Sequence, residues 1–120
     1  MILVDTSVWV DHLRRSDEAL VQWLDREQVL GHPHVMGELA LGRIPQRALV
    51  FDALQGLPQA TVATDVEVFD FIELNGLAGL GIGYVDAHLL AAVRLTPASA
   101  FWTRDRRLQS VAQRLGYPTI

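Results

Sequence analysis

The sequence contains no cysteine and no lysine. Without cysteine, the chain has no disulfide framework, no thiolate metal site and no cysteine nucleophile. A P-loop, a response-regulator receiver and the common aspartate-nucleophile phosphatases each normally place a lysine beside phosphate, so the absence of lysine argues against all three. All ten cations are arginine. Arginine has a planar fork suited to phosphate, although an arginine-only composition can equally reflect the base composition of the genome.

The chain is also short of positive charge and of long hydrophobic runs. Its formal net charge of −4, taken by itself, argues against a nucleic-acid partner. The most apolar stretch, residues 74–93, is interrupted by four glycines and by Asp86, so we expect no transmembrane helix. No basic and apolar signal region precedes the first strand, and we expect a soluble cytoplasmic protein. With 120 residues, 50% of them apolar, the chain is expected to form one domain over residues 1–120.

Short apolar runs alternate with amphipathic segments along the whole chain. Strands are predicted at residues 1–4, 29–31, 60–63, 100–103 and 117–120. Helices are predicted at about residues 7–14, 17–27, 33–42, 45–54, 65–74, 84–95 and 105–115. Pro33 and Pro45 are expected to open helices, and Thr64 to cap one. Strands separated by helices predict an α/β fold, a three-layer α/β/α sandwich with a mostly parallel sheet of four to five strands.

Two carboxylates are predicted to follow directly on strands. Four apolar residues lead to Asp5, and Thr6 or Ser7 is expected to cap the helix that follows. Asp105 comes shortly after the apolar strand at residues 100–103. The functional crevice of an open parallel sheet lies at the carboxyl ends of its strands. We therefore expect Asp5 and Asp105 to lie near one another, in a position suited to chemistry.

Two further acids stand alone among uncharged residues. Glu38 is the only charged residue within residues 31–42, and Asp86 is the only one within residues 74–93. A buried carboxylate is costly unless a cation or hydrogen bonds compensate it, and no arginine lies close by in the sequence. Clustered carboxylates without cysteine are typical of a site for Mg²⁺ or Mn²⁺. The two solitary acids and the two acids at strand ends together predict such a site.

Simpler roles stay open for each acid. Asp5 and Asp86 could cap the helices that they begin, and Glu38 could lie on an exposed helix face. Asp105 lies among arginines and could form a surface ion pair or a helix cap. Each role is plausible alone, whereas the coincidence of several isolated acids favours a shared site.

The histidines offer a competing metal site. His32 and His34 flank Pro33, and His88 lies near Asp86. Pro33 constrains the first pair, and no third histidine has helical spacing to it. Core or hydrogen-bonding positions are therefore favoured over a zinc site for these histidines.

The segments that carry the four acids resemble the four acidic motifs of PIN-domain ribonucleases. They are Ile2–Trp9, His32–Ala40, Gly83–His88 and Trp102–Asp105. More narrowly, they are similar to the VapC toxins of bacterial type II toxin–antitoxin modules. The resemblance covers essentially the whole chain, and the ordered set of four segments is far more specific than any one of them.

This resemblance implies helices around a parallel sheet, with Asp5, Glu38, Asp86 and Asp105 gathered in one pocket. It also implies a Mg²⁺-dependent endoribonuclease that forms a homodimer and is neutralised by a cognate VapB-like antitoxin. We expect Asp5 and Asp86 to hold the ion directly and Asp105 to bind the same ion or a second one. Glu38 is expected to act as a ligand through water or to orient the attacking water.

Hydroxyl groups and arginines near these acids are candidates for binding substrate. They are Thr6, Ser7, Thr103, Arg14, Arg15, Arg43, Arg104, Arg106 and Arg107. Two other functions remain open. The acids could instead receive an arginine from a partner in a PIN-like module of weak activity. They could also serve a metal-dependent phosphatase or DNA nuclease, because carboxylates alone do not recognise the 2′-hydroxyl group.

Overall fold

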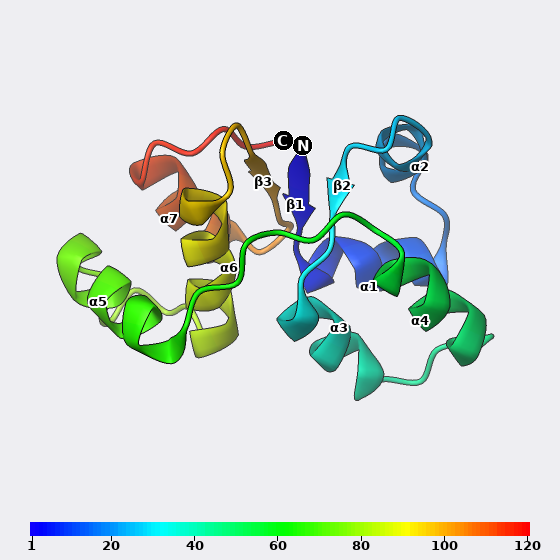
Figure 1. The fold of residues 1–120 in the computed structure, drawn as a ribbon, viewed down its shortest axis with the longest axis horizontal. Helices are drawn as coiled ribbons and strands as arrows, with labels where there is room; N and C mark the ends of the chain where they lie inside the picture. Colours follow the sequence, from blue (N-terminus) through cyan, green and yellow to red (C-terminus); the bar gives the residue numbers. More distant parts are fainter.

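The computed structural model describes all residues 1–120, and its strands form one parallel sheet. β1 (Ile2–Val4) lies in the centre, between β2 (Val29–Leu30) and β3 (Ala100–Trp102). Both neighbours pair with β1 in the parallel direction, so the carboxyl ends of all three strands lie at one edge. Figure 1 shows the strands side by side, with β1 and β2 leading towards α1 and α3.

At each side of the sheet, a further segment adds a single parallel bridge. The bridges join Gly31 to Gln59 and Phe101 to Thr119. They occur at or next to the predicted strands 60–63 and 117–120. Pro58 and Pro118 precede the bridging residues and have no N–H group to donate, which limits a longer ladder. The predicted α/β fold class is confirmed, with three strands and two isolated bridges in place of four to five strands.

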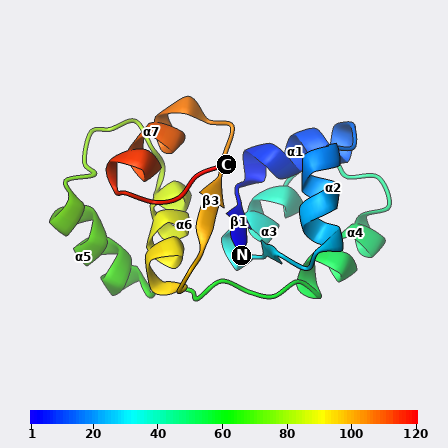
Figure 2. The ribbon, with the colours of Figure 1, turned by 90° about the horizontal axis from the view of Figure 1, so that it is seen from above.

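Seven helices surround the sheet. They are α1 (Thr6–Arg14), α2 (Glu18–Asp25), α3 (Pro33–Ala40), α4 (Arg47–Gln55), α5 (Asp65–Asn75), α6 (Tyr84–Leu95) and α7 (Arg106–Arg114). Figures 1 and 2 show α5, α6 and α7 on one side of the sheet and α1 to α4 on the other. This arrangement gives the three layers expected from the alternation of strands and helices.

Several helices begin where local chemistry predicts. The Thr64 hydroxyl group accepts a hydrogen bond from the Glu67 N–H, and the Glu67 carboxylate accepts one from the Thr64 N–H, which forms a capping box. Pro33 stands in the first turn of α3. By contrast, α4 begins two residues after Pro45, because Gln46 adopts a left-handed conformation with φ of 53°.

The helix α6 forms much of the core. Its residues from Ala87 to Val93 are all buried, and it packs against β3, α3 and α5. A helix buried on all sides requires apolar residues around its whole circumference, which explains why charge appears only near its ends, at Asp86 and Arg94. None of the helices has both the length and the apolar character needed to cross a bilayer.

Candidate functional site

Asp5 lies at the carboxyl end of β1 and is only 5% exposed. Its Oδ2 accepts hydrogen bonds from the Ser7 hydroxyl at 2.6 Å and from the Thr103 hydroxyl at 2.8 Å. The Ser7 N–H also points to Oδ2, at 3.4 Å, so Asp5 is the N-cap of α1. The prediction that Thr6 or Ser7 caps this helix is wrong, because α1 already begins at Thr6 and the acceptor comes from the residue before it.

Asp105 is held at the end of the neighbouring strand. The hydroxyl group of Thr103, itself buried, accepts a hydrogen bond from the Asp105 N–H at 3.1 Å. Asp105 Oδ1 accepts hydrogen bonds from the N–H groups of Arg107 and Leu108 at 2.9 and 3.1 Å, which caps α7. The cap fixes the carboxylate near the end of β3, and its Oδ2 accepts none of the hydrogen bonds.

Glu38 is an exposed residue of α3 that is tied to α1. The Thr6 hydroxyl donates a hydrogen bond to Glu38 Oε1 at 2.6 Å. Thr6 directly follows Asp5 in the chain. Its hydrogen bond to Glu38 therefore holds that acid near Asp5, although the two acids are 33 positions apart.

Asp86 lies half-buried in the first turn of α6, where its Oδ2 accepts a hydrogen bond from the Gly83 N–H at 2.9 Å. Burial raises the pKa of Asp86, and the negative charges of Asp5, Asp105 and Glu38 raise it further, against the opposing effect of the Gly83 hydrogen bond. A carboxylate senses like charges in this way only when they are close. The fold therefore places Asp5, Glu38 and Asp105 close enough to Asp86 for their charges to act on it.

Each of the four acids accepts hydrogen bonds on one carboxylate oxygen only. The second oxygen of each accepts none from the chain. Hard cations such as Mg²⁺ bind oxygen ligands of this kind. With the side chains in their present positions, no group of three acids or histidines is arranged to hold a metal ion. Side-chain rotation of the carboxylates would therefore have to accompany metal binding.

The sequence matches the PIN domain family over residues 2–114. This chain belongs to the PIN-domain family. It is 47% identical over 116 residues to Ribonuclease VapC32 of Mycobacterium tuberculosis, in strains CDC 1551 / Oshkosh and ATCC 25618 / H37Rv. These alignments cover 97% of this chain and 94% of each relative. The family predicted from the four acidic segments is thus confirmed.

The fold of this PIN domain is also similar to a chain in the crystal structure of FitAcB from Neisseria gonorrhoeae. The TM-score is 0.65, and the match covers 100% of this chain and 96% of that chain. Because the identity is 20%, this similarity concerns the fold alone.

Three histidines of the PIN domain form a row that the sequence does not reveal. The His34 ring lies 5.2 Å from that of His32 and stacks on that of His88 at 4.2 Å between centroids. His88 Nε2 lies 3.1 Å from Asp65 Oδ1, which also accepts a hydrogen bond from the Tyr84 hydroxyl at 2.5 Å. The rings of His32 and His34 are tilted by 43° and only those of His34 and His88 are stacked, and with the side chains in these positions the three rings are not arranged to hold a metal ion. Only the packing of α3 against α6 brings His88 to the other two.

Arg104, a predicted substrate-binding residue, is engaged by carboxylates of the PIN domain itself. Its guanidinium group pairs with Asp11 at 2.6 Å and with Asp17, and lies 5.8 Å from the centre of the Trp102 ring. These contacts join the end of β3 to α1 and to the start of α2. Arg104 is therefore less available to substrate than its position beside Asp105 suggests.

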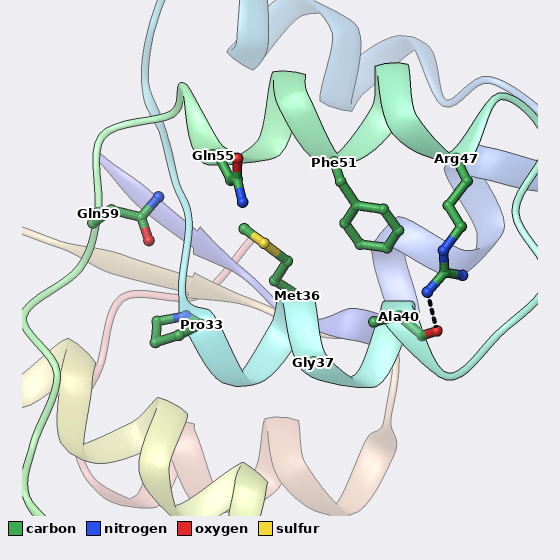
Figure 3. Close-up of a pocket in the computed structure, with 8 residues that line it drawn as sticks. All are labelled: Pro33, Met36, Gly37, Ala40, Arg47, Phe51, Gln55 and Gln59. Atoms are coloured by element: carbon green, nitrogen blue, oxygen red, sulfur yellow. Dashed lines mark hydrogen bonds between the residues drawn. The ribbon is translucent and has the colours of Figure 1, made fainter.

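The other predicted arginines of the PIN domain are exposed and form no ion pair. They are Arg14, Arg15, Arg43, Arg106 and Arg107. Arg14 and Arg43 line a groove of about 480 Å³ that Glu38 also lines. A larger hollow of about 560 Å³ between α3 and α4, drawn in Figure 3, is lined by none of the four acids.

Proposed function

We propose that this chain is a metal-dependent endoribonuclease and the toxin of a type II toxin–antitoxin module. The observation that carries the proposal is that the fold brings Asp5, Glu38 and Asp105 close enough to Asp86 for their charges to act on it. Four acids that interact at the carboxyl edge of a parallel sheet suit metal-assisted phosphodiester hydrolysis. The similarity to Ribonuclease VapC32 over nearly the whole chain supports RNA as the substrate.

Mg²⁺ or Mn²⁺ fits the chemistry of the four carboxylates, each of which has an oxygen that accepts no hydrogen bond from the chain. Asp5 and Asp86 would hold the ion, Asp105 would bind the same ion or a second one, and Glu38 would act through water. When bound, the ion would supply positive charge to the scissile phosphate and promote ionisation of the attacking water.

Hydrogen bonds within the protein hold the carboxylates in position. The Ser7 and Thr103 hydroxyl groups donate hydrogen bonds to Asp5 Oδ2 and hold this carboxylate at the end of β1. The hydrogen bond from Thr6 to Oε1 leaves the Oε2 atom of Glu38 free to orient a water molecule. The N-cap interactions of Asp105 keep its carboxylate at the end of β3.

We further propose that a VapB-like antitoxin neutralises the protein and that two copies form a homodimer. Similarity to a VapC ribonuclease supports the antitoxin. Large apolar side chains on the surface of α5 support an additional protein contact, since Val66, Phe69 and Leu74 are 69%, 59% and 85% exposed. Light scattering of the purified protein tests the homodimer, and a monomeric mass at micromolar concentration would contradict it.

The nuclease is tested by incubating the purified protein with a pool of structured RNA, with Mg²⁺, with Mn²⁺ and with a chelator. Asp5→Asn and Asp86→Asn test the acids. Asp25→Asn is the matched control, because Asp25 is exposed at the end of α2 and has no hydrogen-bond partner. We expect discrete cuts that require the metal, disappear in the first two variants and persist in the third.

The same experiment separates the proposed enzyme from its alternatives. Matched single-stranded DNA and a phosphate monoester are added as substrates in parallel. Cleavage of DNA, or release of phosphate without RNA cleavage, would reassign the substrate of the site. Absence of any metal-dependent cleavage would favour a binding module that uses the acids to receive a partner's arginine.

A further inference from the structure

A groove beside Glu38 combines an apolar floor with two unpaired arginines. It lies between α1 and the connection from α3 to α4, and its volume is about 480 Å³. Its apolar lining residues are Val10, Leu13, Leu39, Ile44 and Pro45. Arg14 enters it from the end of α1 and Arg43 from the connection. The groove therefore offers apolar contact and positive charge directly next to one of the four acids.

The charges of the groove favour an anion. Glu38 is its only acidic lining residue, and the hydrogen bond from Thr6 is the only one that its carboxylate accepts. Neither Arg14 nor Arg43 pairs with a carboxylate, although the chain carries more acids than bases. Arg104, by contrast, has two carboxylate partners. Two guanidinium groups without internal partners suit the oxygens of a phosphate, which arginine binds with its planar fork.

The connection that carries Arg43 is tied down by the helix that follows. Arg47 donates hydrogen bonds to the carbonyl oxygens of Ala40 at 2.5 Å and of Gly42 at 3.1 Å. Its guanidinium group also lies 5.0 Å from the centre of the Phe51 ring, and Figure 3 shows Arg47 and Phe51 side by side on α4. These contacts satisfy carbonyl groups at the end of α3 and hold Arg43 at the rim of the groove.

We propose that this groove is an RNA subsite that holds one unstacked nucleotide next to the scissile phosphodiester. Its base lies on the apolar floor and its phosphate lies between Arg14 and Arg43. Proteins that recognise single-stranded RNA splay its unstacked bases out onto their side chains, arginine among them. Small-molecule pockets measure about 300–1,000 Å³, which includes the volume of this groove. The inference rests on the proposed nuclease function and adds the residues that hold the RNA beside the cut.

The test compares Arg14→Gln, Arg43→Gln and the double variant with the wild type on an RNA that the wild type cuts. Arg26→Gln is the matched control, because Arg26 is an exposed arginine just before β2, at the opposite edge of the sheet from the acids. We expect each single change to raise KM about 5- to 30-fold with kcat within about twofold, and to reduce the salt dependence of KM by about one phosphate contact. Arg26→Gln is expected to leave both constants unchanged.

A second arm tests the apolar floor. RNA that lacks one base, at each position around the mapped cut in turn, is cleaved by the wild type and by Ile44→Ala. We expect one position at which loss of the base raises KM for the wild type by about 5- to 30-fold, and at which the effect is smaller for the variant. Thermal melting of each variant verifies that the fold is retained.

The outcomes separate the inference from the function on which it rests. If the wild type cuts RNA with metal and the arginine variants show the KM of Arg26→Gln, the subsite is wrong and the nuclease stands. If the variants bind RNA normally and lose only inhibition by the antitoxin, the groove is a protein-docking surface and the subsite is also wrong. If the wild type cuts no RNA with either metal, the proposed nuclease function is wrong, and so is the subsite that rests on it.

Discussion

The hydroxyl group of Thr103 donates a hydrogen bond to Asp5 Oδ2 at 2.8 Å, although the two residues are 98 positions apart. The parallel pairing of β1 with β3, in which Val4 lies opposite Trp102, brings them together. The same hydroxyl accepts the N–H of Asp105 at 3.1 Å. One buried side chain thus connects two of the four acids. The spacing of these acids is therefore set by the register of the central strands.

Replacement of Thr103 tests this connection. Thr103→Val keeps the shape of the side chain but removes one of the two hydroxyl donors to Asp5 Oδ2 and the acceptor of the Asp105 N–H, so we expect the free energy of unfolding to fall by about 1–3 kcal/mol. Thr103→Ser retains the hydroxyl and is expected to lose less than half as much. Urea denaturation followed by circular dichroism measures both. Equal unfolding midpoints for the valine and serine variants would show that the hydrogen bond contributes nothing.

Asp86→Asn is expected to increase stability while abolishing RNA cleavage. Burial and three nearby acids raise the pKa of Asp86, so the folded protein pays an electrostatic cost when this group ionises, and the cost grows as pH rises above the ordinary range of an aspartate. A neutral amide removes the cost and can still accept the Gly83 hydrogen bond. In chelator at pH 7 we expect the melting temperature to rise by about 2–6 °C.

Titration with Mg²⁺ completes the test of Asp86. Metal that binds the folded state alone raises its stability, so the wild type is expected to gain more from Mg²⁺ than Asp86→Asn does. Calorimetric scans at increasing Mg²⁺ measure the difference. An equal gain in both proteins would place the metal elsewhere.

His32 is expected to make the protein less stable in mild acid. Burial, reinforced by His34 and His88, lowers the pKa of His32 from 6.5 to about 4. Between these values the unfolded chain binds a proton that the folded protein does not, so stability falls as pH decreases from 6.5 to about 4. The slope is about 1.4 kcal/mol per pH unit, and His32 has no effect above pH 7.

His32→Asn isolates this contribution. His32 Nδ1 accepts the His34 N–H at 3.0 Å as the N-cap of α3, and asparagine can supply an acceptor at the same position. The variant is expected to be less stable at pH 7, because it is smaller, yet to depend less steeply on pH below 6.5. Urea midpoints measured from pH 7 to pH 4.5 give both slopes, and parallel curves would exclude His32 as the titrating group.

Features that depend on a few neighbouring residues were predictable from the sequence. Asp5 and Asp105 follow apolar runs, so their positions at strand ends could be inferred before the pairing of the strands was known. The histidine row and the partners of Arg104 depend on contacts across the fold, which no local pattern encodes. The edges of the sheet were predictable only in part, because the segments at Gln59 and Thr119 approach it as expected but form only one bridge each.

Replacement of Arg104 tests whether this residue stabilises the fold or binds substrate, as the sequence predicted. Its ion pairs with Asp11 and Asp17 are partly exposed, and such pairs contribute about 0–1 kcal/mol each. Together with the contact with Trp102, they predict that Arg104→Met lowers the free energy of unfolding by about 1 kcal/mol. Because salt screens partly exposed ion pairs, the loss is expected to shrink in 1 M salt, where the Debye length is about 3 Å.

The same variant is then assayed for RNA cleavage, with Arg26→Met as the control, because Arg26 lies 5.7 Å from the centre of the Trp23 ring but forms no ion pair. If Arg104 acts only through the fold, KM per folded molecule stays within about twofold of the wild type while the unfolding midpoint decreases. A raised KM with an unchanged midpoint would mean that substrate displaces both carboxylates from the guanidinium group. In that case Arg104 contacts the RNA, and Asp11 and Asp17 hold it in place until the RNA binds.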